Sequence, residues 1–158
     1  MIDSHCHIND SAFVNNPEIY IKTAKEAGIE EFLVVGYDEK SSRIAVDFAK
    51  KFNECFAAVG IHPSDVKRMK DGDLERIEQL ANDPKVLAIG EIGLDYHHDN
   101  TNKDKQQRVF KRQLEIASRY KKPVIVHSRD AICDTYNILS RYDVRGSVHA
   151  FSGSVEII

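Results

Sequence analysis

Apolar runs of strand length alternate with apolar positions at helical spacing along this chain of 158 residues. The runs are rich in Val, Ile and Ala and nearly continuous, which is typical of parallel strands covered on both faces. The segments between them repeat their apolar residues with the period of an amphipathic helix. The predicted strands are residues 1–7, 31–36, 55–63, 86–89, 122–128 and 146–153, and the predicted helices are residues 17–27, 44–52, 74–80, 102–120 and 130–141.

Residue types at the ends of two helices support these boundaries. Pro17 is expected to open the first helix and Gly28 to close it, in agreement with the usual asymmetry of helix ends. Asp73 is expected to be the N-cap of the third helix.

Strand–helix pairs joined by short links predict a parallel sheet with right-handed crossovers. Polar residues gather at the ends of five of the six strands, which favours a TIM-type (β/α) barrel over a doubly wound sheet. A glycine-rich dinucleotide fingerprint is also absent after the first strand. Since a complete barrel has eight strands in about 250 residues, we expect an α/β fold that is an incomplete barrel with about six of the eight strands. It would form a single domain over residues 1–158 that lacks the C-terminal part of the barrel.

Composition narrows the class of protein. Hydrophobic residues make up 42% of the chain and charged residues 30%, as in ordinary soluble domains. A net charge of −3 argues against a broad basic surface that grips nucleic acid along its length. The three cysteines have no metal-ligand spacing, which favours reduced thiols in the cytoplasm. With neither a targeting segment nor an apolar run of membrane-spanning length, we expect a soluble cytoplasmic protein with no membrane partner.

Glu91 is the residue whose position most demands an explanation. It follows the buried run 86–89 and lies between Gly90 and Gly93, which cannot shield it. An ionised carboxylate at the mouth of a buried strand costs several kcal/mol unless a cation meets it. That cation could be a Lys or Arg side chain from a neighbouring element, or a metal ion.

Histidines at the ends of other predicted strands favour the metal ion. His5 and His7 are two residues apart on one strand, so both rings project from the same face. His127 and His149 each fall at a strand end, in a fold that brings such ends together. A mixed set of imidazoles and a carboxylate suits Zn, Mn or Fe, and with bridging oxygens also Mg.

Two ions that share the carboxylate of Glu91 would allow these histidines and Glu91 to activate a water molecule. A water molecule held between two such ions about 4 Å apart loses its proton near neutral pH and becomes a nucleophile. The predicted cofactors are therefore two divalent ions (Mg, Mn or Zn), with Glu91 and His127 as catalytic residues. The candidate metal ligands are His5, His7, Glu91, His127 and His149.

The same residues carry a resemblance to a known family. Five segments in order resemble the TatD family of metal-dependent deoxyribonucleases, within the amidohydrolase-like barrels: DSHCHIN, GIHP, GEIGLDYH, PVIVHSRDA and HAFSGS. The resemblance implies a (β/α)8 barrel whose two-metal site hydrolyses phosphodiester bonds of DNA. It also implies trimming from a 3′ end, so that the expected substrate is single-stranded DNA or DNA ends.

The resemblance assigns the ligands to two ions. His5, His7 and Glu91 would hold one of them. Glu91, His127 and His149 would hold the other.

The resemblance also places His62 and Arg129 where substrate phosphate would bind, although each has a plainer interpretation. His62 could simply end a strand, and Arg129 could pair with Asp130 or with a helix carboxylate. Asp95 could be a catalytic acid, or a hydrogen-bond partner that orients a ligand histidine.

The chain departs from the family pattern at its end. The last metal ligand of the family, an aspartate on the final barrel strand, has no counterpart after the sixth predicted strand. Strands one and six would then have unpaired edges, which invites pairing with another chain. The hypothesis is a truncated or frameshifted member of the family, or one completed by a second polypeptide or a swapped subunit.

Three functions remain open from the sequence. The first is a metal-dependent nuclease acting on DNA. The second is an amidase or aminoacyl-ester deacylase of the same superfamily, although many of these have a bridging lysine on strand four, where this chain has Glu91. The third is a remnant that binds metal or a partner and catalyses nothing.

Overall fold

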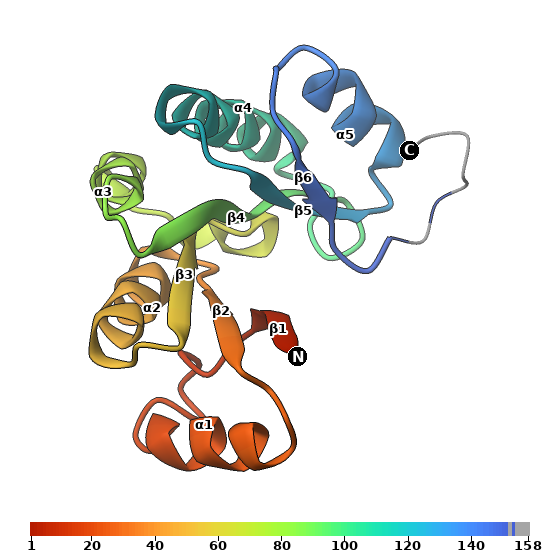
Figure 1. The fold of residues 1–158 in the computed structure, drawn as a ribbon. Helices are drawn as coiled ribbons and strands as arrows, with labels where there is room; N and C mark the ends of the chain where they lie inside the picture. Colours follow the sequence, from red (N-terminus) through yellow and green to blue (C-terminus); the bar gives the residue numbers. More distant parts are fainter. Residues whose placement is uncertain (152, 154–158) are drawn as a thin grey trace.

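The structure is a computed structural model that describes residues 1–151 and 153. Six parallel strands form one sheet in sequential order from β1 to β6, and the sheet curls with its helices on the outside (Figure 1). The strands are β1 (Ile2–Cys6), β2 (Glu31–Val35), β3 (Cys55–Val59), β4 (Val86–Asp95), β5 (Val124–Arg129) and β6 (Gly146–Val148). The helices are α1 (Pro17–Glu26), α2 (Glu39–Lys51), the 3₁₀ helix η1 (Pro63–Arg68), α3 (Asp73–Ala81), α4 (Lys103–Tyr120) and α5 (Ile132–Leu139). The predicted α/β architecture, an incomplete (β/α) barrel with six strands, is confirmed.

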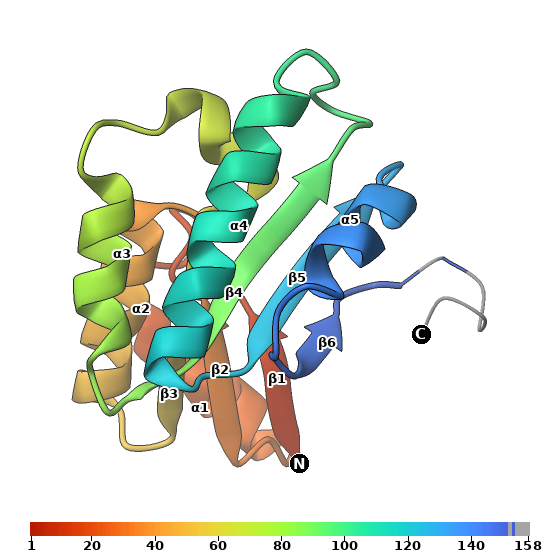
Figure 2. The ribbon, with the colours of Figure 1, turned by 90° about the horizontal axis from the view of Figure 1, so that it is seen from above.

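The two faces of the sheet bury different residues because strand side chains alternate in direction. Val34 and Ala57 face the helices and belong to the larger core. Their neighbours Val35 and Ala58 face the other way, into a smaller apolar cluster. Helices α2, α3 and α4 lie side by side over the outer face (Figure 2), so that most of the core lies between them and the sheet.

Strand β4 differs most from the prediction. It was expected to end at residue 89, but it continues to Asp95, so Glu91 lies inside the strand and not at its carboxyl end. The apolar run is interrupted at Gly90 and Glu91, and this interruption hides the continuation of the strand. Gly93 has a φ of 138°, and its backbone lies against the carbonyl oxygen of His127 on β5. The register of β4 against β5 shifts between Ile89 and Ile92, and an irregularity of this kind interrupts the ladder without ending the strand.

Other boundaries need smaller corrections. The N-cap of α3 is Gly72, and Asp73 is its first residue, with a side chain that accepts a hydrogen bond from the Lys70 N–H. Helix α2 begins at Glu39, after a capping box formed by Asp38 and Ser41, and so precedes the apolar positions 44–52 that predicted it. Strand β6 ends at Val148, and the predicted extension to 153 includes position 152, which lies outside the described residues. Within the described residues, no helix combines the length and the apolarity needed to cross a bilayer.

Two buried glutamines of α4 hold the backbone at the carboxyl ends of the strands. The Gln113 side chain accepts a hydrogen bond from the Ile61 N–H at 2.7 Å and donates one to the Ile61 carbonyl at 3.1 Å. The Gln106 side chain accepts a hydrogen bond from the Asp95 N–H at 2.8 Å and donates one to the Asp95 carbonyl at 3.0 Å. Since the ladder bonds of a strand cannot satisfy these groups where the strand ends, the amide side chains replace them. Helix α4 thereby fixes two segments that carry polar side chains at this rim.

Replacing Gln113 by leucine is expected to lower the free energy of unfolding by about 2–6 kcal/mol, because the N–H and the carbonyl of Ile61 are both left unpaired at a cost of about 1–3 kcal/mol each. Urea denaturation measures this loss. The matched control is Gln79→Leu on the exposed side of α3, which should change stability by less than about 0.5 kcal/mol. Equal stability of the two variants would show that the bonds to Ile61 contribute little.

Candidate metal centre

Glu91 is buried in the middle of the sheet with an imidazole near each of its carboxylate oxygens. Its side chain is 7% exposed. Oε2 lies 3.4 Å from Nε2 of His5, and Oε1 lies 3.4 Å from Nδ1 of His127. Among residues 1–151 and 153, no Lys or Arg forms an ion pair with Glu91. The alternative in which a basic side chain neutralises this carboxylate is therefore not found in the described part of the chain.

The surroundings of Glu91 keep it ionised. Burial raises the pKa of its carboxyl group, but this effect is outweighed by hydrogen bonds from His127 and His5 and by the nearby His62. The net result is a pKa well below the usual range. A buried, charged carboxylate surrounded by imidazoles is a suitable ligand for a divalent cation.

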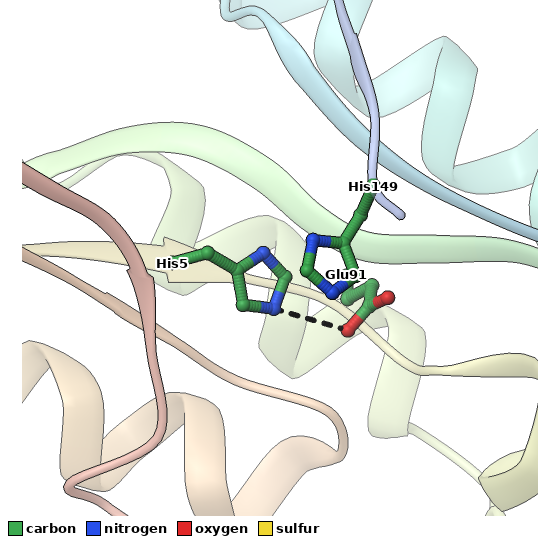
Figure 3. A group of neighbouring side chains, drawn as sticks. All are labelled: His5, Glu91 and His149. Carbon is green, nitrogen blue, oxygen red and sulfur yellow. Dashed lines mark ion pairs between the residues drawn. The ribbon is translucent and has the colours of Figure 1, made fainter. Parts of the chain in front are cut away.

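One group of ligand-type side chains joins the two ends of the sheet. His5, Glu91 and His149 each offer one ligand atom, and these atoms lie within 4.8 Å of one another (Figure 3). His149 follows β6, where its N–H donates to the Val126 carbonyl at 2.8 Å. Its ring stacks on that of His5, with centroids 3.9 Å apart. The curl of the sheet thus brings the first and sixth strands together at this point.

His7 lies beside this group. Its Nδ1 is 2.9 Å from the Val35 carbonyl oxygen, which can only accept a hydrogen bond, so Nδ1 carries the proton. The lone pair of the neutral ring is then on Nε2, which lies 3.2 Å from Nε2 of His5. Both histidines of the H-x-H pair therefore point the same way, as their spacing predicts.

A second group contains His62, Glu91 and His127, whose ligand atoms also lie within 4.8 Å of one another. The Nδ1 of His62 accepts a hydrogen bond from the Ser64 N–H, so the neutral ring carries its proton on Nε2. Burial and the nearby His127 lower the pKa of His62 to about 4, which keeps the ring neutral. His62 is therefore equipped to donate a hydrogen bond into the site rather than to bind a cation through Nε2.

The grouping of the histidines differs from the one that the family resemblance implied. The resemblance implied that His149 and His127 hold the same ion. In the structure the ring of His149 stacks on His5, and the ring of His62 lies against that of His127, with centroids 4.4 Å apart. All five expected ligands and His62 nevertheless lie at one rim of the sheet.

Asp95 is a hydrogen-bond partner of a histidine, which was one of the two roles open to it. Its Oδ2 lies 3.0 Å from Nε2 of His127 and 2.8 Å from Nδ1 of His98. Its Oδ1 accepts hydrogen bonds from the backbone N–H groups of His97 and His98. Burial raises the pKa of Asp95, but the hydrogen bonds from His98 and His127 outweigh it and bring the pKa down to about 2.

Arg129 is the exposed last residue of β5, paired in register with Asp95. The pairing of Arg129 with Asp130 is not seen, because Asp130 Oδ2 contacts Nδ1 of His97 at 2.9 Å. The guanidinium of Arg129 forms no ion pair with any residue of the described ranges, 1–151 and 153. Because Arg129 is two residues after His127 on the same strand, the two side chains lie on the same face of the sheet.

The residues fit a metal centre by the chemistry of their donor atoms. The set combines imidazole nitrogens with one ionised carboxylate that lacks a basic neighbour among the described residues. Such a set suits borderline divalent ions.

Comparison with known proteins agrees with the motifs and the geometry. The family model described as TatD related DNase matches residues 2–158. The chain belongs to this family.

TatD relatives match the chain along nearly its whole length. The uncharacterized metal-dependent hydrolase YabD of Bacillus subtilis is 38% identical over 99% of this chain and 63% of its own length. The 3'-5' ssDNA/RNA exonuclease TatD of Escherichia coli K12 is 31% identical over 99% of this chain and 61% of its own length. The chain therefore spans about three fifths of the length of the curated relatives it matches.

Two solved structures confirm the architecture. The crystal structure of the TatD homolog YjjV from E. coli K12 has a TM-score of 0.93 and 34% identity, covering 99% of this chain and 62% of that one. An uncharacterized amidohydrolase from Saccharomyces cerevisiae has a TM-score of 0.81 at 19% identity, covering 99% of this chain and 64% of that one. The second likeness concerns the fold alone.

Sequence reasoning missed several residues that support this TatD-type site. Gln106 and Gln113 lie on the same face of α4 as the buried Phe110 and Leu114, and polar residues on an apolar helix face are a signal that could have revealed them. His98 contacts Oδ2 of Asp95, and its spacing of three residues from Asp95 is a signal that could have revealed this contact.

Proposed function

We propose that this chain carries the metal centre of a divalent-metal-dependent hydrolase that cleaves phosphodiester bonds of DNA. The observation that carries the proposal is the buried carboxylate of Glu91, with an imidazole at 3.4 Å from each oxygen and no Lys or Arg partner among the described residues. Such a carboxylate would be able to hold divalent ions together with the neighbouring imidazoles, and these ions would supply the charge for hydrolysis. Membership of the TatD family and the exonuclease name of some relatives support the same activity. The domain would extend over residues 1–158.

The side chains divide into ligands and substrate contacts. His5, His7 and His149 lie on the side of Glu91 Oε2, and His127 lies on the side of Oε1. Divalent ions (Mg, Mn or Zn) bound there would supply positive charge for the transition state and lower the pKa of water. Glu91 and His127 are the catalytic residues of this proposal.

The substrate contacts come from the neutral His62 and the charged Arg129. His62 has a ring nitrogen near Glu91 and His127, and its Nε2–H is a donor that would suit a phosphate oxygen. Arg129 offers a planar fork of donors at the rim, and this geometry matches phosphate. Both residues therefore position the scissile phosphate beside Glu91.

The expected substrate is single-stranded DNA, degraded from its 3′ end. With a net charge of −3 the protein has no surplus of positive charge for gripping a long duplex, so phosphate recognition is local. The relative from E. coli K12 is named a 3'-5' ssDNA/RNA exonuclease. We extend the proposal to a cytoplasmic location, since the three cysteines are free thiols.

The edges of the sheet are the proposed contact surfaces for another copy or a complementing chain. Within the described residues, β1 pairs with β2 alone and β6 with β5 alone. A strand edge with unpaired backbone groups is a template for pairing. Size measurement in solution tests this part, and a stable monomer would contradict it.

The activity test uses the full chain with Mn²⁺, Zn²⁺ or Mg²⁺ and single-stranded oligonucleotides labelled at either end. A ladder that shortens from the 3′ end is expected. In His62→Ala the rate should fall about 10–100-fold, since a hydrogen bond to a charged group contributes about 1.5–3 kcal/mol. The control is His97→Ala, an exposed rim histidine outside the proposed substrate contacts, which should keep its activity.

Other outcomes contradict the proposal in distinct ways. Turnover of amide or ester substrates in place of DNA would favour an amidase or deacylase. Bound metal without turnover on any substrate would favour a remnant. Failure to bind a divalent ion would remove the metal centre itself.

A further inference from the structure

Both ring nitrogens of His127 face a carboxylate. Nδ1 lies 3.4 Å from Oε1 of Glu91, and Nε2 lies 3.0 Å from Oδ2 of Asp95. A neutral imidazole has one N–H and one lone pair, so it can donate to only one of these two carboxylates. The identity of that partner decides which nitrogen of His127 is free to bind a cation.

The carboxylate and the backbone of Asp95 are held in place and cannot move to suit the ring of His127. Its side chain is 1% exposed, and its Oδ1 is held by the backbone N–H groups of His97 and His98, at 3.0 Å and 2.8 Å. Gln106 fixes the backbone of the same residue through its N–H and its carbonyl. Oδ2 therefore has a fixed position, and as an ionised oxygen it can only accept hydrogen bonds.

We propose that Asp95 is a positioning residue that keeps the proton of His127 on Nε2, so that His127 presents its lone pair to the metal through Nδ1. The shorter of the two contacts is the one to Asp95, and Nδ1 is the nitrogen that faces Glu91. The proposal rests on the metal centre proposed above, but it concerns a property of the ring that exists before any ion binds.

The centre then uses opposite nitrogens on its two sides. His7 donates from Nδ1 to the Val35 carbonyl and offers Nε2. His127 donates from Nε2 to Asp95 and offers Nδ1. Each ring has its second nitrogen fixed by an acceptor, which is the usual way in which proteins orient ligand histidines.

Asp95→Asn is a variant that should reverse the tautomer while keeping the shape of the side chain. The two backbone N–H groups at Oδ1 require an oxygen there, so the amide NH₂ is forced to face His127 and His98. A donor opposite Nε2 moves the ring proton to Nδ1, where it points at Glu91. We expect divalent-ion affinity on the His127 side to fall about 10–100-fold.

The decisive measurement is the ¹⁵N–¹H long-range NMR spectrum of the metal-free protein at alkaline pH, where the ring is neutral. Wild-type His127 should show the pattern of the Nε2–H tautomer, and Asp95→Asn the pattern of the Nδ1–H tautomer. Calorimetric titration with Zn²⁺ then measures the affinity, with His97→Ala as the matched control. His97→Ala removes an exposed ring that contacts Asp130 and keeps the backbone N–H at Oδ1 of Asp95, so it should leave the tautomer and the affinity unchanged.

Two results would overturn the proposal. One is an Nδ1–H tautomer of His127 in the wild-type protein, which needs no variant to detect. The other is an Asp95→Asn protein that folds, keeps the Nε2–H tautomer and binds Zn²⁺ as the wild type does. If Asp95→Asn does not fold, ¹¹³Cd–¹⁵N coupling in the wild type decides, because it reports directly whether Nδ1 or Nε2 is bound. None of these measurements depends on DNA cleavage. A failure of the proposed nuclease activity can therefore be distinguished from a failure of the proposed role of Asp95.

Discussion

If the proposed metal centre and nuclease activity are present, replacing Glu91 by glutamine is expected to remove most of the stabilisation by divalent ions and to lower the proposed DNA cleavage about 10³-fold. The carboxylate faces His5 through one oxygen and His127 through the other, so an amide must turn an NH₂ toward one of them. Loss of the shared anionic ligand costs several kcal/mol of transition-state stabilisation, and each 1.4 kcal/mol is about a factor of ten.

Thermal unfolding with and without metal measures the binding part of this effect. At a free ion concentration about 100 times the dissociation constant, the wild type should gain about 2.7 kcal/mol for each ion bound. Glu91→Gln should gain almost nothing. The matched control is Glu115→Gln on the exposed face of α4, which should respond to metal as the wild type does. A Glu91→Gln protein with an undiminished shift would place the ions elsewhere.

Replacing Gly93 by alanine is expected to destabilise the protein by roughly 4 kcal/mol. A Cβ at this position would lie 2.0 Å from the carbonyl oxygen of His127, and φ is 138°. Backbone strain of this kind costs about 1–3 kcal/mol, and overpacking adds about 1–3 kcal/mol. Since the clash is with His127 itself, relief of the strain would also displace this ring from Glu91.

Gly28→Ala separates the two contributions. Gly28 also has a positive φ, 93°, but a Cβ there would have no atom within 4 Å. Only the strain remains, and it should cost about 1–2 kcal/mol. Urea denaturation of both variants gives the difference, and a Gly93→Ala protein no less stable than Gly28→Ala would show that β4 and β5 can separate without cost.

Local patterns in the sequence were sufficient for most of the fold. Apolar runs and helical repeats gave six parallel strands in sequential order and the helices between them. The period of two along β1 put His5 and His7 on one face, and that placement needs no tertiary information. Boundaries failed where a local signal was interrupted, as at Glu91 within β4, or where a cap had no side chain, as at Gly72.

The details of the candidate site depend on tertiary geometry that local patterns do not contain. The stacking of His149 on His5 follows from the curl of the sheet, which a single strand does not reveal. The approach of His62 to His127 likewise depends on how the chain turns into η1. The four hydrogen bonds of the Asp95 carboxylate require a loop that folds back on the end of β4. The only local signal for this loop is the i,i+3 spacing of Asp95 and His98.

The stacking of His5 against His149 has a consequence for the order in which the protein matures. These residues come from the first and the sixth strand, so nearly the whole described chain must fold before the two rings meet. Contacts of such long sequence separation are costly in loop entropy and form late. During synthesis, a growing chain that has not yet released His149 from the ribosome presents an incomplete set of ligands. The proposed cation site on that side is therefore assembled only after β6 has paired with β5.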